Sequence, residues 1–252
     1  MPQQPVTAVS PIAVVLAAGK GTRMRSDLPK VLHPLAGEPL AVHVLRSARA
    51  AGVARLVVVV GHGAEQVEAA LGPVFTDLRF VVQAEQLGTG HAVQCALPAI
   101  ADHEGPVLIL SGDVPLLRPA TLAGLVEACA ASGAGLALAT FTPEDPHGYG
   151  RIVRDDRGRI HAVVEERDAD AATRALRECN AGVYCARAEL LRSELPGLGQ
   201  ANAQGEIYLT DLVARAAERG VLTVEVPADE VAGVNTPEQL AALAEILAAR
   251  TA

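Results

Sequence analysis

The sequence predicts a doubly wound α/β fold built on a mixed, mainly parallel sheet. Short apolar runs alternate with segments whose apolar residues recur at helical spacing, which is typical of parallel strands joined by right-handed crossover helices. The first apolar run, Ile12 to Ala17, ends at a glycine-rich turn. A buried strand of this kind delivers its loop to the carboxyl edge of the sheet, where open α/β sheets bind ligands.

The loop after this strand combines bare backbone with positive charge. Gly19 and Gly21 lack a Cβ atom, so backbone N–H groups can approach a ligand there. The basic residues of this region suit a polyphosphate: Lys20, Arg23, Arg25 and Lys30. The string does not match the Walker pattern, and Met24 stands where the dinucleotide fingerprint needs its third glycine, so both of these motifs are disfavoured.

The next elements follow from the same patterns. Helices are predicted over residues 40–51, 64–71, 89–96 and 119–131, and three of them are followed by a glycine, at Gly52, Gly72 and Gly133. Buried strands are predicted over residues 55–60, 80–83, 107–113 and 135–142, where apolar residues run together between turn signals. This order gives strands that alternate with helices, as a parallel sheet requires.

The alternation of strand and helix patterns ends at Pro143. A turn-rich stretch comes first, and short strand-like runs follow at residues 152–154 and 160–166. No flexible linker separates the two parts, so we expect two subdomains on one continuous mixed sheet. A closing helix is predicted from Pro237 to Ala249, with Thr236 as its N-cap.

Composition narrows the class of protein. The 252 residues can bury a sizeable core, which must be aliphatic because half of the residues are hydrophobic and only 2% are aromatic. A formal charge of −8 argues against a nucleic-acid or membrane-surface partner. Met1 to Ser10 shows no secretory signal, and no apolar run approaches the roughly 20 residues of a membrane helix, so a cytoplasmic location is expected. The cysteines lack metal-binding spacing and are expected to be reduced and buried: Cys95, Cys129, Cys179 and Cys185.

Polar groups recur at the predicted carboxyl edge. The amides of Gln83 and Gln86 both donate and accept, as recognition of a pyrimidine edge requires, although solvated loop residues would show the same pattern. Asp113 stands at the C-terminal tip of the fourth predicted strand as either a turn residue or a ligand of Mg²⁺, which prefers one or two protein oxygens plus substrate phosphates.

Several strings together resemble a known family. Leu16-Ala-Ala-Gly-Lys-Gly-Thr-Arg-Met24 with Pro29-Lys30 resembles the signature of sugar-phosphate nucleotidyltransferases. Three further strings narrow the resemblance to the uridyltransferase domain of bacterial N-acetylglucosamine-1-phosphate uridyltransferases. They are Val31-Leu-His33, Leu35-Ala-Gly37 and the loop from Gln83 to Ala92. This implies a Rossmann-like nucleotide-diphospho-sugar transferase fold as a single domain, residues 1–252. Its expected parts are a nucleotide-binding part at about 11–142, a smaller sugar-binding β subdomain at about 143–236, and the closing helix at 237–252.

The resemblance implies a role for individual residues. Arg23 and Lys30 are implied to be catalytic, and Asp113 and Asn235 to bind Mg²⁺ as the cofactor. The implied nucleotide-binding residues are Leu16, Ala17, Ala18, Gly19, Gly21, Thr22, Lys30, Gln83, Gln86, Gly88 and Thr89. The implied sugar-binding residues are Gly150, Glu165, Asn180, Tyr208 and Thr210. Ala181 and Ile207 depart from the family, where a threonine and an aromatic residue are often found.

The implied reaction is Mg²⁺-dependent transfer of a uridylyl group from UTP to N-acetylglucosamine-1-phosphate, which gives UDP-N-acetylglucosamine for cell-wall precursors and pyrophosphate. The attacking phosphate is already ionised at neutral pH, so no nucleophilic side chain or general base is expected. Two alternatives stay open: a nucleotidyltransferase for another nucleotide or sugar phosphate, and a catalytically idle ligand-sensing domain. No hexapeptide repeats of an acetyltransferase β-helix occur in these 252 residues, so that domain is not expected. Self-association is compatible with the sequence but is not predicted by it.

Overall fold

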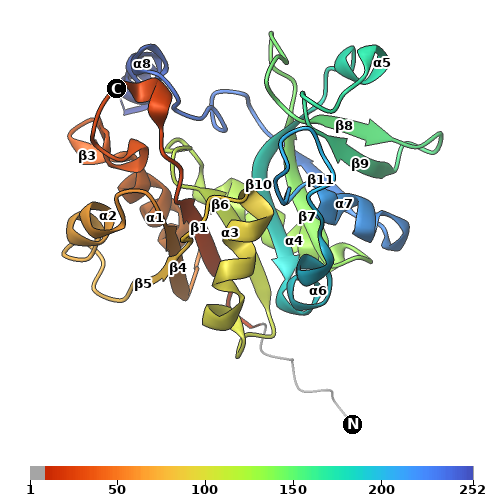
Figure 1. Ribbon diagram of the computed structural model, residues 1–252, viewed down its shortest axis with the longest axis horizontal. Helices are drawn as coiled ribbons and strands as arrows, with labels where there is room; N and C mark the ends of the chain where they lie inside the picture. Colours follow the sequence, from red (N-terminus) through yellow and green to blue (C-terminus); the bar gives the residue numbers. More distant parts are fainter. Residues whose placement is uncertain (1–8, 252) are drawn as a thin grey trace.

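A computed structural model describes residues 9–251 of the chain. Within these residues, nine strands form one sheet with helices on both of its faces (Figure 1). The predicted doubly wound, mainly parallel α/β fold is confirmed. The stretch in which the sequence shows no secretory signal, Met1 to Ser10, lies mostly outside the described residues, which begin at Val9. No helix within residues 9–251 is long and apolar enough to cross a membrane.

Four parallel strands form the first half of the sheet. Strand β1 (Ile12–Ala17) lies between β4 (Arg55–Val60) and β6 (Pro106–Ser111), and β5 (Arg79–Val82) lies at the edge beside β4. The chain therefore runs outward from β1 through β4 to β5 and then returns to the other side of β1. This reversal is a topological switch point, and the carboxyl ends of β1 and β6 form the crevice in which such sheets bind ligands.

The second half of the sheet is mixed. Strand β10 (Cys179–Arg187) is antiparallel to both β6 and β7 (Leu136–Phe141), and β11 (Leu222–Glu225) is parallel to β7 at the far edge. A hairpin of β8 (Arg151–Arg154) and β9 (Ile160–Val164) joins β10 through one residue pair, Cys179 with Arg151. The register of β10 shifts between Asn180 and Tyr184, and a bulge of this kind re-aims side chains beside a site.

Helices cover both faces of the sheet with aliphatic side chains, as the composition requires. On one face lie α1 (Leu40–Ala50), α2 (Ala64–Leu71) and α4 (Pro119–Ala131). On the other lie α3 (Thr89–Ala96), α6 (Ala188–Glu194) and α7 (Asp211–Ala216). The shorter elements are η1 (Thr22–Met24), η2 (Lys30–Leu32), β2 (Pro34–Leu35), β3 (Glu38–Pro39), η3 (Leu97–Ile100), α5 (Ala171–Arg174), η4 (Leu195–Gly197) and η5 (Ala217–Arg219).

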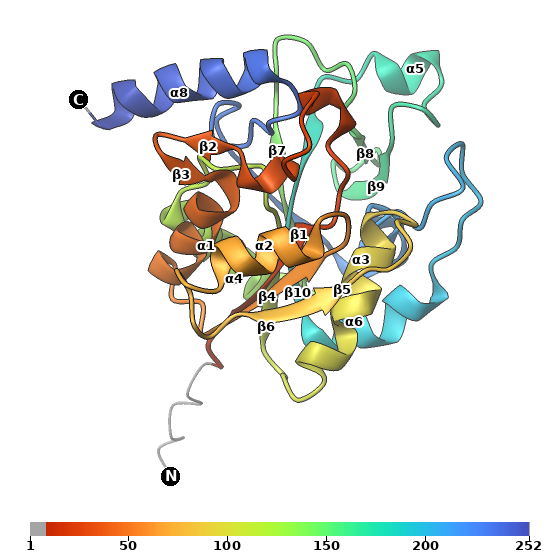
Figure 2. The same cartoon turned by 60° about the vertical axis from the view of Figure 1, so that its left-hand side comes forward.

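The closing helix α8 (Pro237–Thr251) lies across β2 and β3 (Figure 2). Its residue Leu243 belongs to a third buried cluster, with Met24 and Val234 among the members. Thr236 caps the helix as predicted, since its Oγ1 accepts from the N–H of Gln239 at 3.3 Å. In return Oε1 of Gln239 accepts from the N–H groups of Asn235 and Thr236, at 2.8 and 3.2 Å, which completes a capping box.

The sequence-based boundaries differ from the structure mainly at strand ends. The strands predicted to extend to residues 83, 113 and 166 end at Val82, Ser111 and Val164. Gln83, Asp113 and Glu165 consequently lie in loops just beyond the sheet, where side chains are free to face a ligand. The patterns do not predict β10, which begins with Cys-Asn-Ala-Gly, because that string is typical of a turn.

Candidate functional site

A cavity of about 320 Å³ opens at the switch point between β1 and β6. It is lined by most of the predicted nucleotide-binding residues, namely Leu16, Ala17, Ala18, Gly19, Lys30, Gln83, Gln86, Gly88 and Thr89, and by Asp113. Gly21 and Thr22 do not line it. Gly21 instead leaves space for Lys30. Its φ is +59°, and a Cβ atom there would lie 2.7 Å from the Cβ of Lys30. Ser111 and Glu206 line the cavity although the sequence assigns them no role.

Lys30, Asp113, Asn235 and Arg23 meet beside this cavity. Nζ of Lys30 forms an ion pair with Oδ2 of Asp113 and donates to Oδ1 of Asn235 at 3.1 Å. The same Oδ1 accepts from Nη2 of Arg23 at 2.9 Å. The N–H of Val234 donates to the carbonyl of Asp113 at 2.9 Å, which ties the loop before α8 to the loop after β6. Residues from both ends of the chain thus converge on one point.

The oxygen atoms at this point fit the predicted Mg²⁺. Among residues 9–251, no group of three or more His, Cys, Asp and Glu side chains is arranged to hold a metal ion. One carboxylate oxygen and one amide oxygen nevertheless face a single cation, the ammonium of Lys30. These are hard ligands, and two of them match the number that Mg²⁺ takes from a protein when substrate phosphates supply the others.

The two glutamines after β5 differ in exposure. Gln83 is buried, with 3% of its surface exposed, which excludes a solvated loop position for it. Gln86 is exposed, but its Nε2 donates to the main-chain carbonyl of Gln83 at 3.1 Å. Gly88 has a φ of +105°, and a Cβ atom there would lie 2.6 Å from the carbonyl oxygen of Ile207. Glycine is therefore required where this loop crosses the segment before α7.

Four of the five predicted sugar-binding residues lie together at the base of the β8–β9 hairpin. Oγ1 of Thr210 donates to Oε1 of Glu165 at 3.1 Å, and the N–H of Asn180 donates to the carbonyl of Gly150 at 2.8 Å. A Cβ atom on Gly150 would lie 3.4 Å from Oε2 of Glu165. The fifth residue, Tyr208, is buried and lines a second cavity of about 260 Å³ with Glu165.

Two tyrosines lie near Glu165, namely Tyr184 and Tyr208. The ring of Tyr149, the residue before Gly150, instead packs edge-on against Phe141, with ring centroids 4.9 Å apart. Burial, and then the nearby charge of Glu165, raise the pKa of Tyr184. Burial also raises the pKa of Tyr208 to about 12, with Asp168 and then Glu165 as further causes. Tyr184 and Tyr208 therefore both lie close to the Glu165 carboxylate.

Burial raises the pKa of Glu165 itself, and the hydrogen bond from Thr210 opposes this shift. When the pKa of a carboxyl group is higher in the folded protein than in the unfolded chain, the folded state loses stability as the pH rises from the unfolded-state pKa through the folded-state pKa. The reason is that ionisation is easier in the solvated unfolded chain. We expect Glu165→Gln to raise the melting temperature at pH 7, with the gain disappearing below about pH 4, where the carboxyl is protonated in both states. Thermal unfolding followed by circular dichroism at both pH values measures this. The matched control is Glu68→Gln at an exposed position of α2, and an equal gain there would contradict the explanation.

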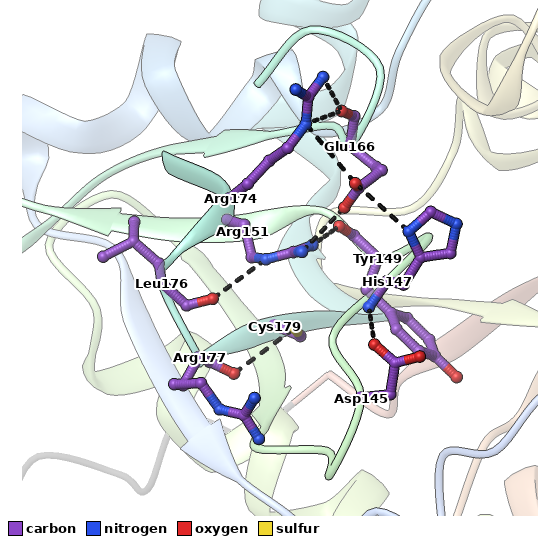
Figure 3. A network of polar contacts seen from close by, with 9 residues as sticks. All are labelled: Asp145, His147, Tyr149, Arg151, Glu166, Arg174, Leu176, Arg177 and Cys179. Carbon is purple, nitrogen blue, oxygen red and sulfur yellow. Dashed lines mark hydrogen bonds and ion pairs between the residues drawn. The ribbon is translucent and has the colours of Figure 1, made fainter. Parts of the chain in front are cut away.

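A buried arginine organises the hairpin (Figure 3). The side chain of Arg151 is 2% exposed and pairs with Glu166, with 2.8 Å between Nη2 and Oε2. Its Nε donates to the carbonyl of Leu176 at 3.1 Å, and its Nη1 donates to the carbonyl of Tyr149. Arg174 and His147 approach the other oxygen of Glu166, each at 3.6 Å. This network fixes both Gly150, next to Arg151, and Glu165, next to Glu166.

The sequence assigns no role to Arg151, which follows the predicted sugar-binding residue Gly150. The available signal is its position between Gly150 and a buried isoleucine, at the start of a strand. His91 is also without an assigned role, and it contacts Gln83 from the first turn of α3.

Comparison with known proteins adds an independent line of information. Residues 13–191 match the MobA-like NTP transferase domain. The bifunctional protein GlmU of Anaeromyxobacter dehalogenans strain 2CP-C is 54% identical over 98% of this chain, and that of Pelobacter propionicus is 49% identical over 94%. The matches cover 51% and 52% of those proteins, so the chain spans about half the length of the curated relatives it matches.

Proposed function

The chain belongs to the family of MobA-like NTP transferase domains, and from this premise we propose that it transfers a uridylyl group from UTP to N-acetylglucosamine-1-phosphate. The products are UDP-N-acetylglucosamine and pyrophosphate. The observation that carries the proposal is the cavity at the switch point, where Lys30 and Asp113 stand beside the buried amide of Gln83. The resemblance of the chain to nucleotidyltransferases, drawn from its sequence, is confirmed by the family match.

The proposed chemistry needs two polyanions held in line and their charge neutralised. An oxygen of the sugar phosphate attacks the α-phosphorus of UTP, and the bond from that phosphorus to the bridging oxygen of pyrophosphate breaks. Lys30 and Arg23 neutralise phosphate charge, and the backbone at Gly19 approaches the phosphate oxygens. Asp113 and Asn235 would hold Mg²⁺, which supplies further positive charge to the phosphates when bound.

We assign the amino sugar to the group around Glu165. Its carboxylate and the side-chain amide of Asn180 can accept from and donate to sugar hydroxyls and an acetamido group. Thr210 already donates to Glu165, and the assignment includes Gly150 and Tyr208. We further assign the enzyme to the cytoplasm, since its four cysteines are free, as in a reducing compartment.

Replacing Lys30 by glutamine is expected to lower kcat/KM for UTP by about 10- to 150-fold, because a hydrogen bond to a charged group contributes about 1.5–3 kcal/mol. Steady-state rates with varied UTP measure the effect. The matched control is Arg157→Gln, which removes an exposed positive charge from the turn of the β8–β9 hairpin, outside the cavity lining. Equal rates for Lys30→Gln and the control would remove Lys30 from the site.

The function is tested by pyrophosphate release from UTP with N-acetylglucosamine-1-phosphate, with and without Mg²⁺. The assay is repeated with CTP, GTP and dTTP, and with glucose-1-phosphate. Mg²⁺-dependent release confined to UTP and the acetylated sugar is the expected result. Release with another pair would overturn the substrates but keep the reaction class, and silence with every pair from folded protein would favour an idle ligand-sensing domain.

A further inference from the structure

The side chain of Gln83 is held by its nitrogen. Its Nε2 lies 3.1 Å from the carbonyl oxygen of Gly88 and 3.1 Å from Nδ1 of His91. The main-chain N–H of Gln83 donates to Val60 at 2.7 Å, and its main-chain carbonyl accepts from Gln86. Among residues 9–251, the side-chain oxygen Oε1 is therefore the polar atom of Gln83 left for a ligand in the cavity that Gln83 lines.

The side-chain amide of Gln83 cannot rotate by about 180° without losing a hydrogen bond. The carbonyl of Gly88 only accepts hydrogen bonds, so a reversed amide would bring two acceptor oxygens together. That carbonyl is itself fixed, because the residues on both sides of Gly88 are bonded to the segment before α7: Ile207 N–H donates to Leu87 at 2.7 Å, and Gly90 N–H donates to Ile207 at 2.8 Å. The first partner of the Gln83 nitrogen is thus part of a rigid crossing.

His91 is the second hydrogen-bond partner of the Gln83 side-chain nitrogen. When its Nδ1 accepts from Gln83, the ring proton of the neutral imidazole must be on Nε2. Nε2 lies 3.7 Å from Sγ of Cys95, one turn further along α3, and sulfur can accept that proton weakly. The ring orientation is therefore set on both sides, and both protons of the Gln83 amide nitrogen are used.

An acceptor held in this way distinguishes pyrimidines. Uracil has a proton on N3, which an amide oxygen can accept, whereas N3 of cytosine is itself an acceptor. Two facing acceptors in a site where Gln83 is only 3% exposed leave buried groups unpaired. Such groups cost about 1–3 kcal/mol each, which corresponds to about 5- to 150-fold discrimination.

We propose that His91 is a specificity-determining positioning residue, which holds the Gln83 amide with Oε1 toward the base and thereby favours uracil over cytosine. This inference rests on the proposed uridylyl transfer for its substrate. His91 acts through Gln83 rather than by contact with the nucleotide.

The test compares His91→Leu, which removes the acceptor, with His91→Asn, whose side-chain oxygen can take the place of Nδ1. The readout is the ratio of kcat/KM for UTP to that for CTP. We expect His91→Leu to lower the ratio by about tenfold, because the amide can then reverse at the cost of one hydrogen bond. His91→Asn should retain the wild-type ratio to within about threefold on the same scale, and KM for the sugar phosphate should not change in either variant. Equal losses with UTP and CTP in His91→Leu would overturn the proposal.

A second measurement is independent of activity. Nitrogen-15 NMR of the histidine-labelled protein reports which ring nitrogen of His91 carries the proton, with the signal assigned by its loss in His91→Leu. The proton on Nε2 is expected, and a proton on Nδ1 would overturn the proposal even if the enzyme is specific for UTP. If the wild-type protein shows no turnover of UTP, the proposed function fails. The tautomer of His91 then decides by itself whether His91 orients the Gln83 amide.

Discussion

Replacement of Asp113 by alanine is expected to lower turnover by at least about a hundredfold, the scale on which the loss of one key electrostatic stabiliser acts. The carboxylate faces the ammonium of Lys30 at the edge of the cavity, and it supplies one of the two oxygens that fit Mg²⁺. Its removal takes away the charged ligand, while the hydrogen bond from Lys30 to Oδ1 of Asn235 can stay. Initial rates of pyrophosphate release measure the effect.

Two further variants separate the possible causes. Asp156→Ala removes an exposed carboxylate from the turn of the β8–β9 hairpin and should leave turnover unchanged. Asp113→Asn keeps an oxygen but loses the charge, so it should require more Mg²⁺ for half-maximal rate than the wild type does. Wild-type turnover in folded Asp113→Ala protein would contradict the metal assignment.

The second large effect concerns stability. Arg151→Met is expected to lower the free energy of unfolding by about 3 kcal/mol or more, since breaking a buried ion pair leaves an uncompensated charge. The change leaves Oε2 of Glu166 without its ion-pair partner, since Arg174 and His147 approach the other oxygen, and it removes a donor from the carbonyls of Tyr149 and Leu176. Urea unfolding followed by circular dichroism measures the loss.

A double mutant identifies the source of that loss. Glu166→Gln in the Arg151→Met background should recover part of the stability, because the unpaired charge is then gone. Arg157→Met, at an exposed position in the hairpin turn, is the matched control and should change the free energy of unfolding by less than about 0.5 kcal/mol. A loss in Arg151→Met no larger than in this control would show that the buried pair does not hold the hairpin.

The parallel half of the fold is predictable because its signals are local. Apolar runs such as Arg55 to Val60 and glycine stops such as Gly52 lie within a few residues of what they specify. The meeting of Lys30 with Asp113 also follows, since loops at the carboxyl ends of neighbouring parallel strands share an edge. By contrast, β10 pairs antiparallel with strands far away in the sequence, and its first residues resemble a turn.

The site is less predictable where it depends on distant packing. Asn235 reaches Arg23 because α8 packs on β2, and that contact has no local signature. The capping box through which Gln239 fixes the backbone of Asn235 is local, but it does not specify where the helix packs. Arg151 is buried although arginine is usually exposed, so composition rules point the wrong way. The orientation of the Gln83 amide depends on Gly88 and His91 together, and only the folded geometry reveals it.

The position of Tyr184 and Tyr208 near Glu165 gives the protein an optical property. The chain has no tryptophan, so its near-ultraviolet emission comes from Tyr149, Tyr184 and Tyr208 alone. Stronger indole fluorescence, which normally masks tyrosine, is missing, and two of the three emitters, Tyr184 and Tyr208, lie near Glu165, where we assign the amino sugar. A sugar phosphate does not absorb at these wavelengths, whereas the nucleotide absorbs strongly. The intrinsic tyrosine fluorescence of the unlabelled protein can therefore report binding of the sugar phosphate separately from binding of the nucleotide.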